Sequence, residues 1–138
     1  MDDNIFDKYE ENYSEPSLWK KIGKTAQNLG ADAIYMALIL FYALNSPSTP
    51  VWAKTVIIGA LGYFISPFDI VPDVTPAVGY ADDIAVMVFA IGAVAMSINE
   101  DVRKQARNKL RDWFPDFDFL HLKKIDDNIE KKRDRQKA

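Results

Sequence analysis

The sequence has no cysteine and a single histidine, His121, among 138 residues. The absence of cysteine excludes disulfides, thiolate metal sites and thiol nucleophiles. One histidine is too few for the ligand sets of most zinc sites, and it leaves little basis for a Ser-His catalytic pair. The net charge is only -3 with both signs abundant, so we expect no nucleic-acid partner.

Charge is almost missing from the middle third of the chain. Residues 51–98 carry 1 basic and 4 acidic side chains, whereas residues 99–138 carry 12 and 9. A water-soluble fold normally distributes charge over the outer faces of all its elements. The middle third is therefore expected to lie inside protein or inside lipid.

Strand-like alternation and internal repeats are also missing, which predicts an all-α fold. Apolar and capping patterns predict a small bundle of about four helices. Ser14 or Ser17 is the expected N-cap of the first helix, and Thr49 that of the second, with Pro50 at its first position. The expected segments are 16–44, 50–65, 80–99 and a charged helix that starts near Glu100 and is broken by Pro115.

The chain length suits one domain with a real hydrophobic core. We expect an acidic extension over residues 1–15 and a single helical domain over residues 16–122. Residues 123–138 are expected to form a charged helix or tail.

Three segments are apolar on every face: 33–44, 55–65 and 84–98. Such helices must be buried on all sides, and a small bundle has room for about one of them. The protein therefore either forms an oligomer or enters a membrane. Since 84–98 covers only about 22 Å of a hydrocarbon core about 30 Å thick, a shallow helical hairpin is favoured over full spans.

Basic residues lie at both open ends of this predicted central hairpin, at Lys54 and from Arg103 to Arg111. The positive-inside tendency then places these ends on the cytoplasmic side of a bacterial cytoplasmic membrane. The basic positions also suit anionic lipid headgroups. Membrane lipids are the expected partners, with a second copy or a membrane protein also possible; a cytoplasmic protein is the alternative.

The turn of the hairpin is rich in aspartate and proline, SPFDIVPDVTPAVGYADD over residues 66–83. Ser66 suits an N-cap, with Pro67 at the first helical position and Asp69 bonding back to the cap. Asp73 offers a second acceptor for free backbone N–H groups.

The second half of the turn admits a similar interpretation. Gly79 is expected to supply a positive φ for the reversal into the next helix. Asp82 and Asp83 then fall in the first turn of that helix, where negative charge is favourable by about 0.3–1 kcal/mol each.

The same aspartates also suit a cation site, which the capping interpretation leaves open. Asp69, Asp73, Asp82 and Asp83 together offer oxygen ligands of the kind that Mg²⁺, Mn²⁺ and Ca²⁺ prefer. A proton or cation relay at the polar end of a hairpin is a third use. No catalytic residue and no other cofactor is assigned.

The stretch closely resembles the signature of the bacterial YkvA-like proteins, a domain of unknown function. That pattern is Ser-Pro-x-Asp-x-Ile-Pro-Asp, a short proline-containing gap, then Gly-Tyr-x-Asp-Asp. Val71 stands where isoleucine is usual. The likeness covers roughly residues 35–100. The matching positions are Ser66, Pro67, Asp69, Pro72, Asp73, Pro76, Gly79, Tyr80, Asp82 and Asp83.

The resemblance implies a small helical membrane-associated protein without an assigned reaction. We therefore expect a structural, adaptor or envelope-related module. The alternative is a soluble oligomeric bundle that binds a divalent cation through the aspartates.

Overall fold

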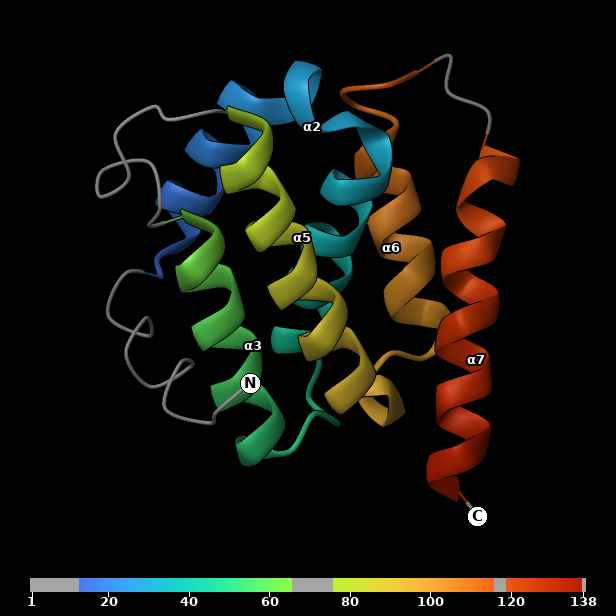
Figure 1. The fold of residues 1–138 in the computed structure, drawn as a ribbon. Helices are drawn as coiled ribbons and strands as arrows, with labels where there is room; N and C mark the ends of the chain where they lie inside the picture. The colour runs from blue at the N-terminus through green and yellow to red at the C-terminus, as the bar shows by residue number, and fades with distance from the viewer. Residues whose placement is uncertain (1–12, 66–75, 116–118, 138) are drawn as a thin grey trace.

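The computed structural model describes residues 13–65, 76–115 and 119–137, with the backbone alone at 24–29, 76–83, 119 and 121. The described residues form helices and turns, so the all-α class is correct for this part of the chain (Figure 1). In chain order the elements are α2 (Glu15–Leu44), α3 (Val51–Ile65), α5 (Pro76–Ala93), η2 (Ala95–Ser97), α6 (Glu100–Leu110), η3 (Phe119–Leu122) and α7 (Lys123–Lys137).

The prediction of about four helices is wrong. α2 consists of two helices that meet at Gly30, so the described residues hold six α-helices and two short 3₁₀ helices. The segment 80–99 is not one helix either, because α5 ends at Ala93 and η2 follows it. Asn99 then begins a new helix, since its side chain accepts a hydrogen bond of 2.9 Å from the Val102 N–H.

Gly30 breaks α2 because its backbone adopts φ 82° and ψ 168°. This region is essentially open to glycine alone, since any Cβ would clash with the backbone there. The break allows the second half of α2 to run back through the bundle (Figure 1). α2 begins at Glu15, and Ser14 is its N-cap because the Ser14 hydroxyl accepts a hydrogen bond of 3.2 Å from the Ser17 N–H. Of the two predicted candidates, Ser14 is therefore the cap.

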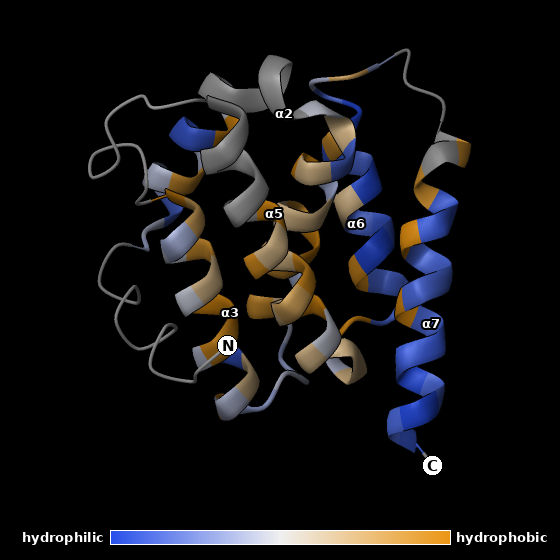
Figure 2. Cartoon of the chain, viewed as in Figure 1, coloured by the Kyte–Doolittle hydropathy of each residue, from blue (hydrophilic) through white to orange (hydrophobic). Residues whose placement is uncertain are grey.

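The second half of α2 is the centre of the bundle. Every residue from 33 to 41 is buried, and α3, α5 and α6 pack around this segment. Figure 2 shows hydrophobic residues gathered where these helices face one another. An all-round apolar helix needs neighbours on every side, and only the central position provides them. α3 and α5 pack together, as the predicted hairpin requires, but the hairpin is not central, because both helices cover α2 from outside.

The turn between α2 and α3 is held by two side chains that bond to the end of α2. Asn45 donates from its side-chain amide to the Phe41 carbonyl at 2.9 Å, and the buried Thr49 hydroxyl donates to the Ala43 carbonyl at 2.6 Å. These bonds satisfy carbonyls that a helix end leaves without partners. Thr49 thus closes α2 and does not open α3 as predicted, and α3 starts at Val51, one residue later than expected.

The three apolar runs differ in how far they are covered. The run at 33–44 is enclosed, whereas those at 55–65 and 84–98 each leave part of one face open to solvent. One chain therefore buries most of the apolar surface that the sequence had assigned to lipid or to an oligomer. None of the helices in the described ranges has the length and apolarity that a membrane crossing requires.

Substitution by alanine should have opposite effects on stability at the two glycines of α2, Gly23 and Gly30. Gly30→Ala should lower the free energy of unfolding by about 1–3 kcal/mol, because alanine is strained at this positive φ. Gly23→Ala should raise it by about 0.5–1 kcal/mol, because Gly23 lies inside the helix with nothing within 4 Å of an added Cβ. Urea denaturation of both variants checks this. Equal effects would show that Gly30 is not a required break.

Candidate functional site

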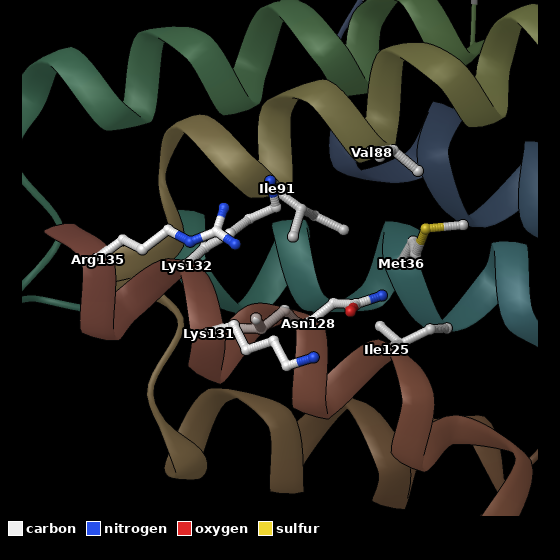
Figure 3. A pocket seen from close by; sticks show the side chains of 9 residues that line it. Met36, Val88, Ile91, Ile125, Asn128, Lys131, Lys132 and Arg135 are labelled. Carbon is white, nitrogen blue, oxygen red and sulfur yellow. The ribbon is translucent and has the colours of Figure 1, made fainter.

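A groove of about 360 Å³ lies between α5 and α7, with α2 at its base (Figure 3). Its apolar surface is formed by five residues from these three helices, and Asn128 lies among them. Figure 3 shows that Lys132 and Arg135 reach from α7 toward α5 at one end of the groove. The apolar residues are Met36, Val88, Ile91, Ile125 and Ile129.

The basic side of the groove consists of Lys131, Lys132 and Arg135. No carboxylate of the described residues lies within ion-pair distance of these three cations. Lys132 lies directly on α5, since a Cβ added to Gly92 would be 3.3 Å from the Lys132 Nζ atom. The groove therefore combines an apolar surface with cations whose charge is not neutralised.

The acidic residues of α7 explain this lack of counter-charge. Asp126 pairs with Arg107 of α6 at 3.2 Å, and Glu130 pairs with the buried Arg103. Arg103 also donates to the Asp126 carbonyl at 3.5 Å. Two of the carboxylates of α7 thus face α6, while the cations at its other side face α5.

Tyr35 extends this polar cluster into the core. Its side chain is fully buried, and its hydroxyl donates to the Asp126 Oδ1 atom at 2.6 Å. Arg107 donates to the same hydroxyl at 3.4 Å and to Glu100 at 2.6 Å. A buried hydroxyl and buried charges are stable only with such partners. The cluster joins α2, α6 and α7, which fixes α7 against the bundle and leaves Tyr35 out of reach of a substrate.

The pKa values of the cluster follow from burial and pairing. Burial raises the pKa of the Tyr35 hydroxyl well above its usual value, and the hydrogen bond to Asp126 raises it further. Arg107 opposes this shift by a smaller amount. The hydrogen bond from Arg107 lowers the pKa of the exposed Glu100 carboxyl. Tyr35 is therefore neutral and Glu100 charged at neutral pH.

The predicted aspartate motif is only partly described. Pro76, Gly79, Tyr80, Asp82 and Asp83 belong to α5, and only their backbone is described. Their side-chain roles stay predictions. The others lie outside the described residues: Ser66, Pro67, Asp69, Pro72 and Asp73.

Two details of the capping interpretation are wrong. α5 begins at Pro76, so Gly79 is inside the helix and does not make the reversal into it. Asp82 and Asp83 lie beyond the first turn, where the favourable effect of the helix dipole has largely faded. The predicted start of this helix, near residue 80, is four residues too late. The prediction interpreted Gly79 as part of a turn and did not consider Pro76 as a proline of the first helical turn.

The cation hypothesis is not tested at the four aspartates. Within the described ranges, no group of three or more His, Asp or Glu side chains could hold a metal ion. Asp69 and Asp73 lie outside these ranges, and the side chains of Asp82 and Asp83 are not described.

The basic positions from 103 to 111 do not form one lipid-facing surface. Arg103 and Arg107 turn inward to the carboxylates of α7, and Lys109 lies over the rings of Trp19 and Trp113 at 5.3 Å from each. The charges of these three residues interact with carboxylates and aromatic rings of the same chain. Lys104 remains exposed on this helix.

The sequence did not predict the groove because residues 123–138 were expected to form a charged helix or tail outside the helical domain of residues 16–122. α7 instead packs on the bundle, with Ile129 buried and Ile125 half-buried. The signal was present, since Leu122, Ile125 and Ile129 follow helical spacing and mark one apolar face. The high charge of the segment hid this pattern.

Comparison with known proteins adds a family match and no reaction. Residues 53–89 match the model of a family described as Protein of unknown function (DUF1232). The matched stretch is about a quarter of the chain and runs from α3 into α5, across the aspartate motif. The chain has no significant match among curated proteins or solved structures.

The Tyr35 cluster predicts a pH-dependent stability effect. Tyr35→Phe should lower the free energy of unfolding by about 1.5–3 kcal/mol at pH 7, because Asp126 loses a buried donor. The folded pKa of Tyr35 lies above the unfolded value of 10.0, so the hydroxyl contributes fully below pH 10. Above pH 10 the unfolded wild type loses the Tyr35 proton and the folded wild type keeps it. The stability difference between the wild type and Tyr35→Phe should therefore shrink by about 1.4 kcal/mol per pH unit. Urea denaturation of the wild type and the variant from pH 7 to 11 measures the loss of unfolding free energy at pH 7 and its change above pH 10.

Tyr42→Phe serves as the control at pH 7. The described part of the chain shows no hydrogen-bond partner for the Tyr42 hydroxyl, so this change should stay within about 0.5 kcal/mol. A Tyr35→Phe penalty that does not change between pH 9 and pH 11 would contradict the assigned pKa shift.

Proposed function

We propose that the protein is a membrane-associated helical module that binds at the bilayer surface and has a structural or adaptor role without a defined reaction. The supporting observation is the distribution of exposed apolar side chains. Of the six large hydrophobic residues that the described ranges expose, five lie on α3, α5 and η2. They are Val51, Trp52, Val88, Phe89 and Met96, and the sixth is Leu120.

These side chains gather because of how α3 and α5 pack. The two helices run in opposite directions, so the start of α3 lies at the same end of the bundle as the end of α5 (Figure 1). Val51 and Trp52 therefore share that end with Met96. Val88 and Phe89 are exposed further along α5. We propose that these side chains together form one apolar surface, since exposed apolar patches mark interaction sites.

The geometry favours binding in the interface over insertion. An apolar helix face of this kind enters a bilayer by about 5–10 Å, to the boundary of headgroups and acyl chains. Trp52 is 57% exposed, and tryptophan is one of the residue types enriched at that depth. The cations of α7 add attraction to anionic lipids, worth about 1 kcal/mol for each Lys or Arg near the surface.

We also propose that the chain belongs to the YkvA-like family. The ten matching positions of the signature all lie within the stretch that matches the uncharacterised family model. The resemblance implies association with a membrane, which agrees with the exposed apolar surface. The proposed location is the inner surface of the cytoplasmic membrane, with a cytoplasmic pool as the alternative.

Flotation with phosphatidylglycerol vesicles tests the proposal. Trp52→Ser combined with Met96→Ser should reduce vesicle binding by about tenfold or more, because about 100 Å² of apolar surface no longer leaves water. Both residues are about half exposed and neither belongs to the buried core, so the fold should be retained. Alkaline carbonate should release the wild-type protein from membranes, as expected for surface binding.

The control is Leu120→Ser, which removes an exposed apolar side chain from η3 and should leave vesicle binding unchanged. Absence of vesicle binding by the wild-type chain would refute the proposal. A defined oligomer that the Trp52 and Met96 changes dissociate would assign the same surface to a second copy.

A further inference from the structure

We propose that the groove between α5 and α7 binds the anion of a single-chain fatty acid, with the carboxylate at Lys132 and Arg135 and the chain along the apolar residues. The inference goes beyond surface binding, because it assigns a site for one amphiphilic molecule in solution. It holds or fails without any membrane. The surface proposed to enter the bilayer shares Val88 with the groove, but its other members, Trp52 and Met96 among them, do not line the groove.

The two ends of the groove differ in chemistry. Lys132 and Arg135 lie at one end, and the apolar Val88, Met36 and Ile125 lie at the other, with the uncharged amide of Asn128 beside them (Figure 3). Ile125 and Arg135 are ten residues apart on α7, which corresponds to about 15 Å along the helix axis. A molecule that lies along this direction meets cations at one end and apolar side chains at the other, which is the polarity of a fatty acid.

The cations specify the sign of the charge at the head. Asp126 and Glu130 are paired with the arginines of α6, so the charge of Lys132 and Arg135 is directed to the groove. The other acids near them, Asp127 and Asp134, are exposed and form no ion pair within the part of the chain that the structure describes. A carboxylate would supply the missing counter-charge, and the arginine fork can hold both of its oxygens.

The volume of the groove suits a ligand with one hydrocarbon chain and a compact head group. About 360 Å³ lies at the lower end of the range for small-molecule sites, which is roughly 300–1,000 Å³. A partner helix of the same length would occupy roughly 1,200 Å³, so most of it would lie outside the groove. A phospholipid with two chains exceeds the volume as well. An extended fatty-acid chain with its carboxylate fits best.

Calorimetric titration of the full chain with sodium dodecanoate, kept below its micelle concentration, tests the inference. We expect one molecule bound per chain, and an affinity that falls about fourfold for each methylene removed from the probe. Dodecyltrimethylammonium has the same chain with a cationic head and should not compete. No binding of dodecanoate, or equal binding of the cationic probe, would overturn the inference.

Variants locate the two ends of the ligand. Lys132→Gln with Arg135→Gln should weaken dodecanoate binding at least tenfold, whereas Lys123→Gln with Lys124→Gln, exposed on the same helix, should not change it. Val88→Asp should weaken binding at the apolar end, and Ala85→Asp, exposed on α5 outside the groove, is its control. Equal losses in the test and control variants would refute the site.

Two further measurements are needed. One distinguishes a carboxylate from a phosphate head group, and the other distinguishes the groove from the surface proposed to bind membranes. Tighter binding of dodecyl phosphate than of dodecanoate would assign the site to a phosphate head and overturn the carboxylate. Trp52→Ser with Met96→Ser should retain dodecanoate affinity while it reduces vesicle binding. Loss of both activities in this variant would show that the groove is not a separate site.

Discussion

The structure depends on the need to cover the second half of α2 on all sides. Nine consecutive residues, 33–41, are buried there, and a helix with no polar face has no stable place at a surface. α3 and α5 cover one part of it, and α6 another. The break at Gly30 follows from the same constraint, because the chain must turn sharply before it can run through the centre. The outer helices therefore take their positions from this one segment.

α7 is attached differently from the other helices, by polar contacts as much as by apolar ones. Most residues of α7 are charged. Ile129 is the only residue of α7 that the structure shows as buried. Tyr35, Arg103 and Arg107 supply the contacts that its small apolar face lacks. Those contacts also sort the charges of α7, with paired acids on the α6 side and cations on the α5 side. The polar cluster thus determines the electrostatics of the groove, although it does not line it.

Local patterns predicted the features that depend on neighbours in the sequence. The all-α class, a cap at Ser14 or Ser17 and the burial of 33–44 were all accessible, because composition and spacing over one or two turns determine them. The break at Gly30 was not, since glycine is tolerated inside helices and only tertiary packing requires its positive φ. The polar cluster was not accessible either, because Arg103 and Glu130 are 27 residues apart and no local pattern pairs them. The groove lies between elements far apart in the chain, so it emerged only with the fold.

The modest apolar contact of α7 has a consequence for how the molecule opens. A helix held by ion pairs, by hydrogen bonds such as those of Asp126 and Arg133, and by one buried isoleucine is expected to separate from the bundle as a unit at a lower free energy than global unfolding. Backbone amides of α7 would then exchange with solvent deuterium sooner than those of α2, and sooner still as salt screens the α6 pairs. Because α7 is one wall of the groove, a ligand bound there would raise the free energy of this opening. Exchange of the α7 amides would thereby report whether the groove is occupied.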